Sequence, residues 1–301
     1  MANAVPARGD PVLQKVPAAE LGDTASKMYN GPMTTWLSLC LTALAYTLLS
    51  TGYVLQKKGI SWIGYKGEKG RSFYRALGIW IVGFLLMNLY IVPNAAALKL
   101  LDPHIVSAMA GWGVIVLVFL SQALLQERIL RFDVAFTLLI VAAIVVLNIF
   151  ERPEAGQDMV RLGPLIAAMA FPFLLVLPAL APALTRRTRG LLFASVSGLS
   201  AGLIIVTLKI LVASFGYRVA GYFASPHLYL YLVFSLGSFL ALQASYKMGR
   251  MLAVGPVQYS AAIIYPVLCS AAVFGNRLHI IQIVAVGTVV AGVWGILRKH
   301  G

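Results

Sequence analysis

Residues 132–150 read FDVAFTLLIVAAIVVLNIF, a run of 19 residues in which Asp133 carries the only charge. A helix needs about 20 apolar residues to cross roughly 30 Å of hydrocarbon, so this run predicts a transmembrane helix. Similar runs recur along the whole chain. They predict nine spans, at 34–56, 76–98, 104–125, 132–150, 162–184, 190–214, 227–246, 252–275 and 279–297.

The composition of the 301-residue chain supports this prediction. Hydrophobic residues make up 60% of it and charged residues 11%, whereas an ordinary globular domain is about 25% charged. We therefore expect an all-α polytopic membrane protein. Composition excludes a disordered chain, a nucleic-acid-binding domain and a secreted disulfide scaffold. An outer-membrane barrel is excluded because these runs do not alternate between apolar and polar residues.

The basic residues predict an orientation in the membrane. Of the 24 Lys and Arg residues, 15 fall on one side of the predicted spans, 8 fall on the other, and Lys209 lies inside a span. Because the more basic side usually faces the cytoplasm, we expect the N-terminus outside and the C-terminus in the cytoplasm, most simply in the cell (inner) membrane.

An internal repeat is visible between 72–150 and 223–299. When the halves are aligned at an offset of 149 residues, two features coincide. A polar turn before the last span of each half matches Glu127-Arg128 with Asn276-Arg277, and an amide in the second span of each half matches Asn94 with Gln243. One linking helix between two four-helix repeats inverts the second repeat, and inverted-repeat transporters place their site near the midplane. The expected segments are a mobile tail at 1–33, a first repeat at 34–150, a linking fifth helix at 151–189 and a second repeat at 190–301.

This arrangement resembles the drug/metabolite transporter superfamily. The Glu127-Arg128 pair looks like the acidic-basic signature of that superfamily, and 227–297 is similar to the last three helices of small multidrug resistance proteins. The nine-helix layout, with Leu55-Gln56-Lys57-Lys58-Gly59 closing the first span, looks most like the NIPA-type branch. The resemblance implies a secondary transporter, and the branch implies magnesium as the solute.

The acidic residues argue against magnesium. Mg²⁺ prefers hard oxygen ligands, usually including a carboxylate, yet all ten acids lie in the tail, in predicted loops or at span ends. The stretch Gly83-Phe84-Leu85-Leu86-Met87-Asn88 has no acid where that branch is expected to carry one. A divalent-cation transporter therefore stays an alternative.

Polar side chains at membrane depth are the candidate solute ligands. Four of them are amides, which can bind solute or can join helices by hydrogen bonds: Asn88, Asn94, Gln243 and Gln258. Lys209 is the only charge well inside a predicted span. It either binds an anionic solute or extends to the membrane interface.

Aromatic and small residues complete the candidates. Four aromatic residues could wall a site for an organic solute or a cation, or could simply pack: Trp112, Tyr246, Tyr259 and Tyr265. Two stripes of small residues favour close helix contacts. They are Ala194, Gly198 and Gly202, and then Gly287, Ala291 and Gly295, the second being also a candidate homodimer interface.

The leading functional hypothesis is a secondary transporter that moves an uncharged, zwitterionic or anionic metabolite by alternating access. The sequence has no nucleotide-binding motif, no catalytic cluster and no metal-ligand spacing of histidines. We therefore expect no enzymatic activity, cofactor or bound metal, and expect membrane lipids and a small solute as partners. A non-transporting partner subunit of a membrane complex is the remaining alternative.

Overall fold

The computed structural model describes residues 32–63, 71–101, 103–150, 161–215, 219–275 and 278–299, and these residues form helices without any strand. Most of the predicted tail and the Asn276-Arg277 pair lie outside the described residues. The helices are α2 (Pro32–Ile63), α3 (Arg71–Leu89), α4 (Ile91–Leu98), α5 (Pro103–Ala108), α6 (Ala110–Leu125), α7 (Arg131–Ile149), α8 (Leu162–Leu180), α9 (Arg186–Phe215), α10 (Val219–Ala224), α11 (Pro226–Met248), α12 (Met251–Phe274) and α13 (Ile280–Lys299).

The described residues contain nine helical segments that are long and apolar enough to cross a membrane. Each of them coincides with one of the predicted spans. The all-α, multi-pass prediction is therefore confirmed. Many large apolar side chains point outward, as the surface of a membrane-embedded bundle requires, since lipid replaces water as the solvent. Examples are Leu85, Ile166 and Trp294.

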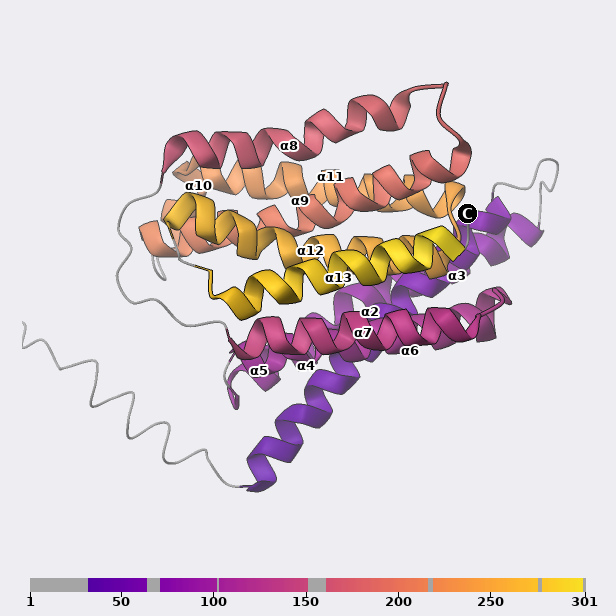
Figure 1. Ribbon diagram of the computed structural model, residues 1–301, viewed down its shortest axis with the longest axis horizontal. Helices are drawn as coiled ribbons and strands as arrows, with labels where there is room; N and C mark the ends of the chain where they lie inside the picture. Colours follow the sequence, from indigo (N-terminus) through magenta and orange to yellow (C-terminus); the bar gives the residue numbers. More distant parts are fainter. Residues whose placement is uncertain are drawn as a thin grey trace, which may run out of the picture.

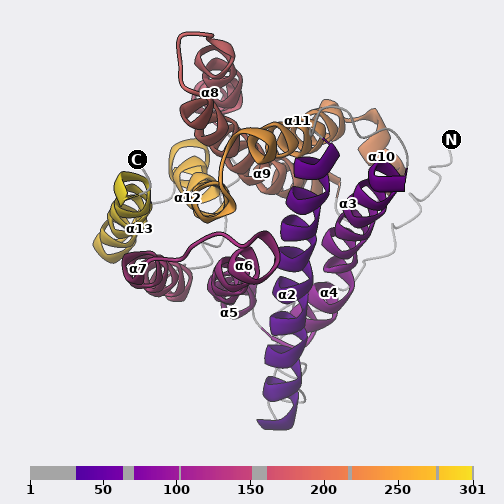
Figure 2. The ribbon, with the colours of Figure 1, turned by 90° about the vertical axis from the view of Figure 1, so that its right-hand side faces the viewer.

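The long helices lie side by side, and α2 crosses the bundle at a steep angle (Figure 1). The end-on view places α8 at the edge beside α9, and it places α7 next to α13 (Figure 2). Within the first half α2 packs against α3 and α6, and within the second half α9 packs against α11 and α12. The main core joins the halves, because it contains buried residues of both, such as Leu117, Ile144 and Val254.

The helices differ from the predicted spans at several positions, including a break at Met109 between α5 and α6 in the third span. The first helix continues to Ile63, so Lys57 lies inside α2 rather than in the loop that follows a span ending at 56. The second span is broken at Tyr90, between α3 and α4. Pro93 explains the break, since it has no N–H to donate to the carbonyl of Leu89, four residues earlier.

Small residues bring several helices into close contact. A Cβ atom at Gly198 would lie 2.4 Å from the carbonyl oxygen of Gln258, so α9 and α12 can touch only where α9 lacks a side chain. The packing interpretation of that stripe is thus confirmed. In the other stripe a Cβ at Gly295 would lie 2.4 Å from the Phe136 ring, so this part of α13 packs on α7 within the chain.

Candidate functional site

One face of α2 carries hydrogen-bonding side chains through the depth of its span. They recur every three or four residues, which places them on one side of a helix with 3.6 residues per turn. We call this set the polar face of α2: Ser38, Thr42, Tyr46, Ser50, Tyr53 and Lys57. All lie within the apolar segment Met33–Ser61.

The polar face of α2 contacts both halves of the chain. Near its start, the Ser38 hydroxyl donates to the carbonyl oxygen of Ala97 on α4, at 3.1 Å. At its centre, the hydroxyl of Ser50 donates to the carbonyl oxygen of Gly113 on α6, at 2.7 Å, and lies 3.0 Å from the hydroxyl of Tyr259 on α12. This face therefore contacts only the first half near its start and both halves at its centre.

Beside this face, two glutamines and a tryptophan form an amide–tryptophan cluster: Gln56, Gln243 and Trp80. The Gln243 Nε2 donates to Oε1 of Gln56 at 2.5 Å. The Trp80 Nε1 donates to Oε1 of Gln243 at 3.0 Å. Because the cluster joins α2 and α3 to α11, it is a direct polar link between the halves.

Aromatic rings cover this cluster on one side. The Trp80 and Phe84 rings are stacked, with centroids 5.7 Å apart and planes 10° apart, and Phe239 of α11 meets both edge-on. Flat aromatic walls around amide groups suit a small organic solute, which needs both apolar contact and a few directed hydrogen bonds.

Three tyrosines lie between the halves at the centre of the polar face. The rings of Tyr53 and Tyr259 meet edge to face, with centroids 5.8 Å apart, and the Gln258 side chain lies beside Tyr53. The hydroxyl of Tyr246 is buried and has no hydrogen-bond partner among the described residues. A buried hydroxyl without a partner costs about 1–3 kcal/mol, so a polar group of a bound molecule would be stabilised there.

At one end of the polar face, charged side chains hold the turn between α11 and α12, residues 249–250. The ammonium of Lys57 donates to the carbonyl oxygens of Tyr246 and Gly249, the latter at 2.5 Å. The Glu127 carboxylate accepts from the backbone N–H groups of Met251, at 2.7 Å, and Leu252, at 2.9 Å. A cation thus meets the C-terminus of α11 and an anion meets the N-terminus of α12, the favourable sign at each helix end.

Further basic side chains bind carbonyl groups at this same end of the bundle. Arg186 donates to the carbonyl oxygen of Lys247 at 2.5 Å, and Arg187 donates to that of Leu297 at 2.8 Å. Lys57, Arg186 and Arg187, which sequence counting assigned to one side, therefore lie at the same end of the bundle.

The structure brings four of the predicted site residues together around the polar face of α2: Gln243, Tyr246, Gln258 and Tyr259. Trp112 flanks them, since its Nε1 donates to the hydroxyl of Thr47 on α2 at 3.1 Å while 42% of the residue stays exposed.

The structure places the other four elsewhere. Asn88 is exposed and its amide donates to Phe84 in its own helix, at 2.8 Å. Lys209 is exposed on α9. The hydroxyl of Tyr265 donates to the carbonyl oxygen of Ala168 at 2.7 Å, which fixes α12 to α8.

Asn94 does not share a binding position with Gln243. Asn94 lies one turn before Ala97, which contacts α2 at Ser38, whereas Gln243 contacts α2 at Gln56. Eighteen residues of helix separate these contacts on α2, or about 27 Å. Asn94 and Gln243, both predicted as solute ligands, are therefore too far apart to touch one small solute in this arrangement.

Five residues of the site were not predicted: Ser50, Tyr53, Gln56, Lys57 and Trp80. The signal for most of them was present, because polar side chains repeat at helical spacing through the first apolar run. Trp80 gave no such signal, since a tryptophan in a span more often packs against lipid or neighbouring helices.

The two acidic residues within the described part of the chain stabilise helix ends. Glu127 caps α12, and the Asp133 carboxylate accepts from the backbone N–H of Leu130 at 2.8 Å, before the start of α7. Among all the residues that the structure describes, no three His, Cys, Asp or Glu side chains come close enough together to hold a metal ion.

The sequence matches no protein-family model and no curated protein, and no solved structure matches the fold. A function must therefore be inferred from the geometry of this polar interface.

Proposed function

We propose that this chain is a secondary transporter of a small uncharged or zwitterionic organic solute, which binds at the polar face of α2. One observation carries the proposal. In a bundle with an apolar exterior, amide, hydroxyl and ammonium groups gather at membrane depth where α2 meets α11 and α12. Polar groups at this depth are costly, so they mark solute pathways by default.

The contacts of the two halves support alternating access. The packing of α2 against α3 and α6 has its counterpart in the packing of α9 against α11 and α12, and α7 meets α13 between the halves. Such a correspondence is expected of two inverted repeats joined by α8. It agrees with the resemblance to the drug/metabolite transporter superfamily, which we retain as a proposal.

The donors and acceptors of the site favour a neutral or zwitterionic solute. The amide–tryptophan cluster offers both hydrogen-bond donors and acceptors, and the Tyr246 hydroxyl adds another of each kind. The Lys57 ammonium is already occupied by two carbonyl oxygens, and Lys209 is exposed on α9. A purely anionic solute would therefore have to displace Lys57 from the end of α11.

A divalent cation is the less favoured solute. The carboxylates of Glu127 and Asp133 are bonded to backbone N–H groups at helix ends. Amide, hydroxyl and backbone carbonyl oxygens could ligate Mg²⁺, but without a carboxylate they lack the charge such a site usually supplies.

We also propose that the end bearing Lys57, Arg186 and Arg187 faces the cytoplasm, in keeping with the excess of basic residues there. In this orientation Lys57 and Glu127 close the pathway on the cytoplasmic side by fixing the α11–α12 turn. Opening would require those bonds to break.

Uptake by proteoliposomes tests the proposal. Purified protein should be reconstituted and offered radiolabelled polyols, amino acids and monocarboxylates, with Mg²⁺ as a fourth class, and compared with protein-free liposomes. We expect uptake from the polyol or amino-acid class. Uptake of Mg²⁺ alone would support the cation alternative, and uptake of no class would contradict a transporter.

A matched pair of amide variants locates the site in the same assay. Gln243→Leu removes the bonds to Gln56 and Trp80 and should lower uptake at least tenfold. Asn88→Leu removes an amide of the same chemistry from an exposed face and should leave uptake unchanged. Equal effects of both changes would place the site away from the polar face of α2.

A further inference from the structure

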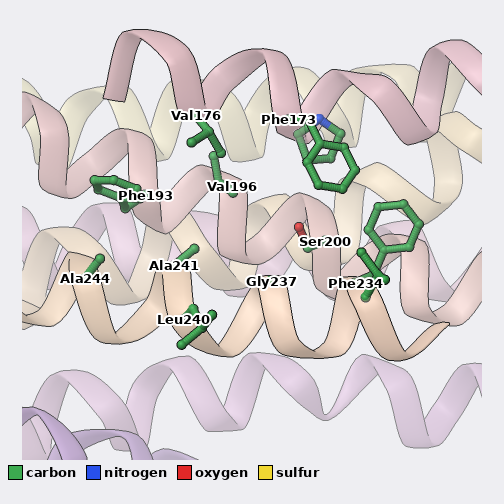
Figure 3. Close-up of a pocket in the computed structure, with 12 residues that line it drawn as sticks. Phe173, Val176, Phe193, Val196, Ser200, Phe234, Gly237, Leu240, Ala241 and Ala244 are labelled. Carbon is green, nitrogen blue, oxygen red and sulfur yellow. The ribbon is translucent and has the colours of Figure 1, made fainter. Parts of the chain in front are cut away.

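An apolar cavity lies on another side of α11 than the amide–tryptophan cluster. It has a volume of about 310 Å³ and lies between α8, α9 and α11 (Figure 3). Its lining includes Phe173 of α8, Val196 of α9 and Phe234 of α11, and apart from Ser200 it is apolar. The volume is at the lower end of the range of small-molecule sites.

This cavity opens toward the surrounding bilayer. Two of its lining residues on different helices are also exposed on the outside of the bundle, Phe173 at 53% and Leu240 at 57%. Its floor is formed in part by Gly237, where an added Cβ would meet no described atom within 4 Å. An apolar chain could therefore enter sideways from the hydrocarbon layer and find unfilled space.

One end of the cavity is basic. Phe193 and Ala244 lie together at that end (Figure 3). Arg189 precedes Phe193 by four residues and Lys247 follows Ala244 by three, so each lies one turn beyond the cavity on the same side of its helix. The Nε of Arg189 is buried and has no hydrogen-bond partner among the described residues.

We propose that this cavity binds one acyl chain of an anionic glycerophospholipid, whose phosphate is held by Arg189 and Lys247. The apolar lining and its opening at membrane depth select a lipid chain. The unsatisfied guanidinium N–H selects an oxyanion at the end of that chain, since Arg pairs well with phosphate oxygens.

The position along the membrane normal agrees with this ligand. Arg186, Arg187 and Lys57 lie at the same end of the bundle, and basic pockets between spans on a cytoplasmic face bind anionic headgroups. The lipid would join α8 to α9 and α11. This inference does not depend on transport, since it uses none of the residues of the polar face of α2.

Native mass spectrometry of the full chain tests the proposal. Delipidated protein in detergent should be titrated with phosphatidylglycerol or with phosphatidylcholine of the same chain length. We expect at least tenfold greater retention of phosphatidylglycerol. Gly237→Leu should fill the cavity and reduce retention of both lipids at least fivefold. Gly287→Leu is the matched control, because Gly287 on α13 also has open space around it.

A second variant tests the headgroup contact. Arg189→Gln keeps a polar side chain and should reduce phosphatidylglycerol retention to the level of phosphatidylcholine. Melting temperatures within a few degrees of wild type will show that both variants fold. Equal retention of the two lipids by wild type, or undiminished retention by folded Gly237→Leu, would overturn the proposal. Complete displacement of phosphatidylglycerol by inorganic phosphate would also overturn it, because the acyl chain would then contribute nothing.

Discussion

Replacing Lys57 with methionine tests whether its ammonium holds the α11–α12 turn. Methionine keeps the apolar stem, which packs along the helices, and removes the charge with both hydrogen bonds. A hydrogen bond to a charged group contributes about 1.5–3 kcal/mol. Because the bonds to Tyr246 and Gly249 share one donor, we expect the variant to lose about 2–3 kcal/mol in the free energy of local opening rather than twice the single value.

Hydrogen–deuterium exchange measures this opening directly. The backbone N–H of Gly249 donates to Ser245 at 2.8 Å, and that of Val254 donates to Arg250 at 2.9 Å, so a peptide covering 245–254 reports on the turn. Exchange of amides through local opening follows the opening equilibrium, in which each 1.4 kcal/mol is a factor of ten. The expected acceleration in Lys57→Met is therefore about 30- to 150-fold.

Lys209→Met is the matched control, because it removes a lysine from the exposed side of another span. It should leave exchange at 245–254 unchanged. If this peptide exchanges as slowly in Lys57→Met as in wild type, the Lys57 ammonium does not hold the α11–α12 turn.

Three further changes test individual contacts. Tyr259→Phe removes the hydroxyl beside Ser50 and should lower the free energy of unfolding by about 1 kcal/mol, measured by denaturation in detergent. Its fractional loss of uptake should exceed its fractional loss of unfolding free energy. Glu127→Gln weakens the anionic cap of α12 and should cost about 1 kcal/mol in the same measurement, and an unchanged value would contradict the cap. Gly198→Leu forces a side chain into the backbone of α12 and should cost about 1–3 kcal/mol or more, so a melting temperature equal to wild type would contradict the close contact of α9 and α12.

The spans could be predicted because a long apolar run is itself the physical requirement for crossing a bilayer. The end of the first span was misplaced for a related reason. Lys57 and Lys58 are typical of a loop at the membrane surface, but α2 continues through both to Ile63. The carbonyl groups at the end of α11 satisfy the Lys57 ammonium, and no feature of the local sequence indicates that distant partner.

The site was predicted only in part, because a sequence shows which residues are polar but not which helix faces meet. Asn88 and Gln243 have the same side-chain chemistry and similar apolar neighbours. In the structure Gln243 joins α11 to α2, while Asn88 bonds within its own helix. The repeat of polar residues along α2 could have identified its inner face, whereas the contact with Gln243 depends on how α11 packs in the second half.

We propose that the polar face of α2 lines a pathway that opens to each side of the membrane in turn. The most direct measurement is the reaction of Ser50→Cys with a membrane-impermeant thiol reagent, in a background that lacks Cys40 and Cys269. Ser50 is fully buried, so it can react only if the halves separate. We expect labelling in right-side-out vesicles and also in inverted vesicles. Labelling from neither side, or from one side alone, would contradict it.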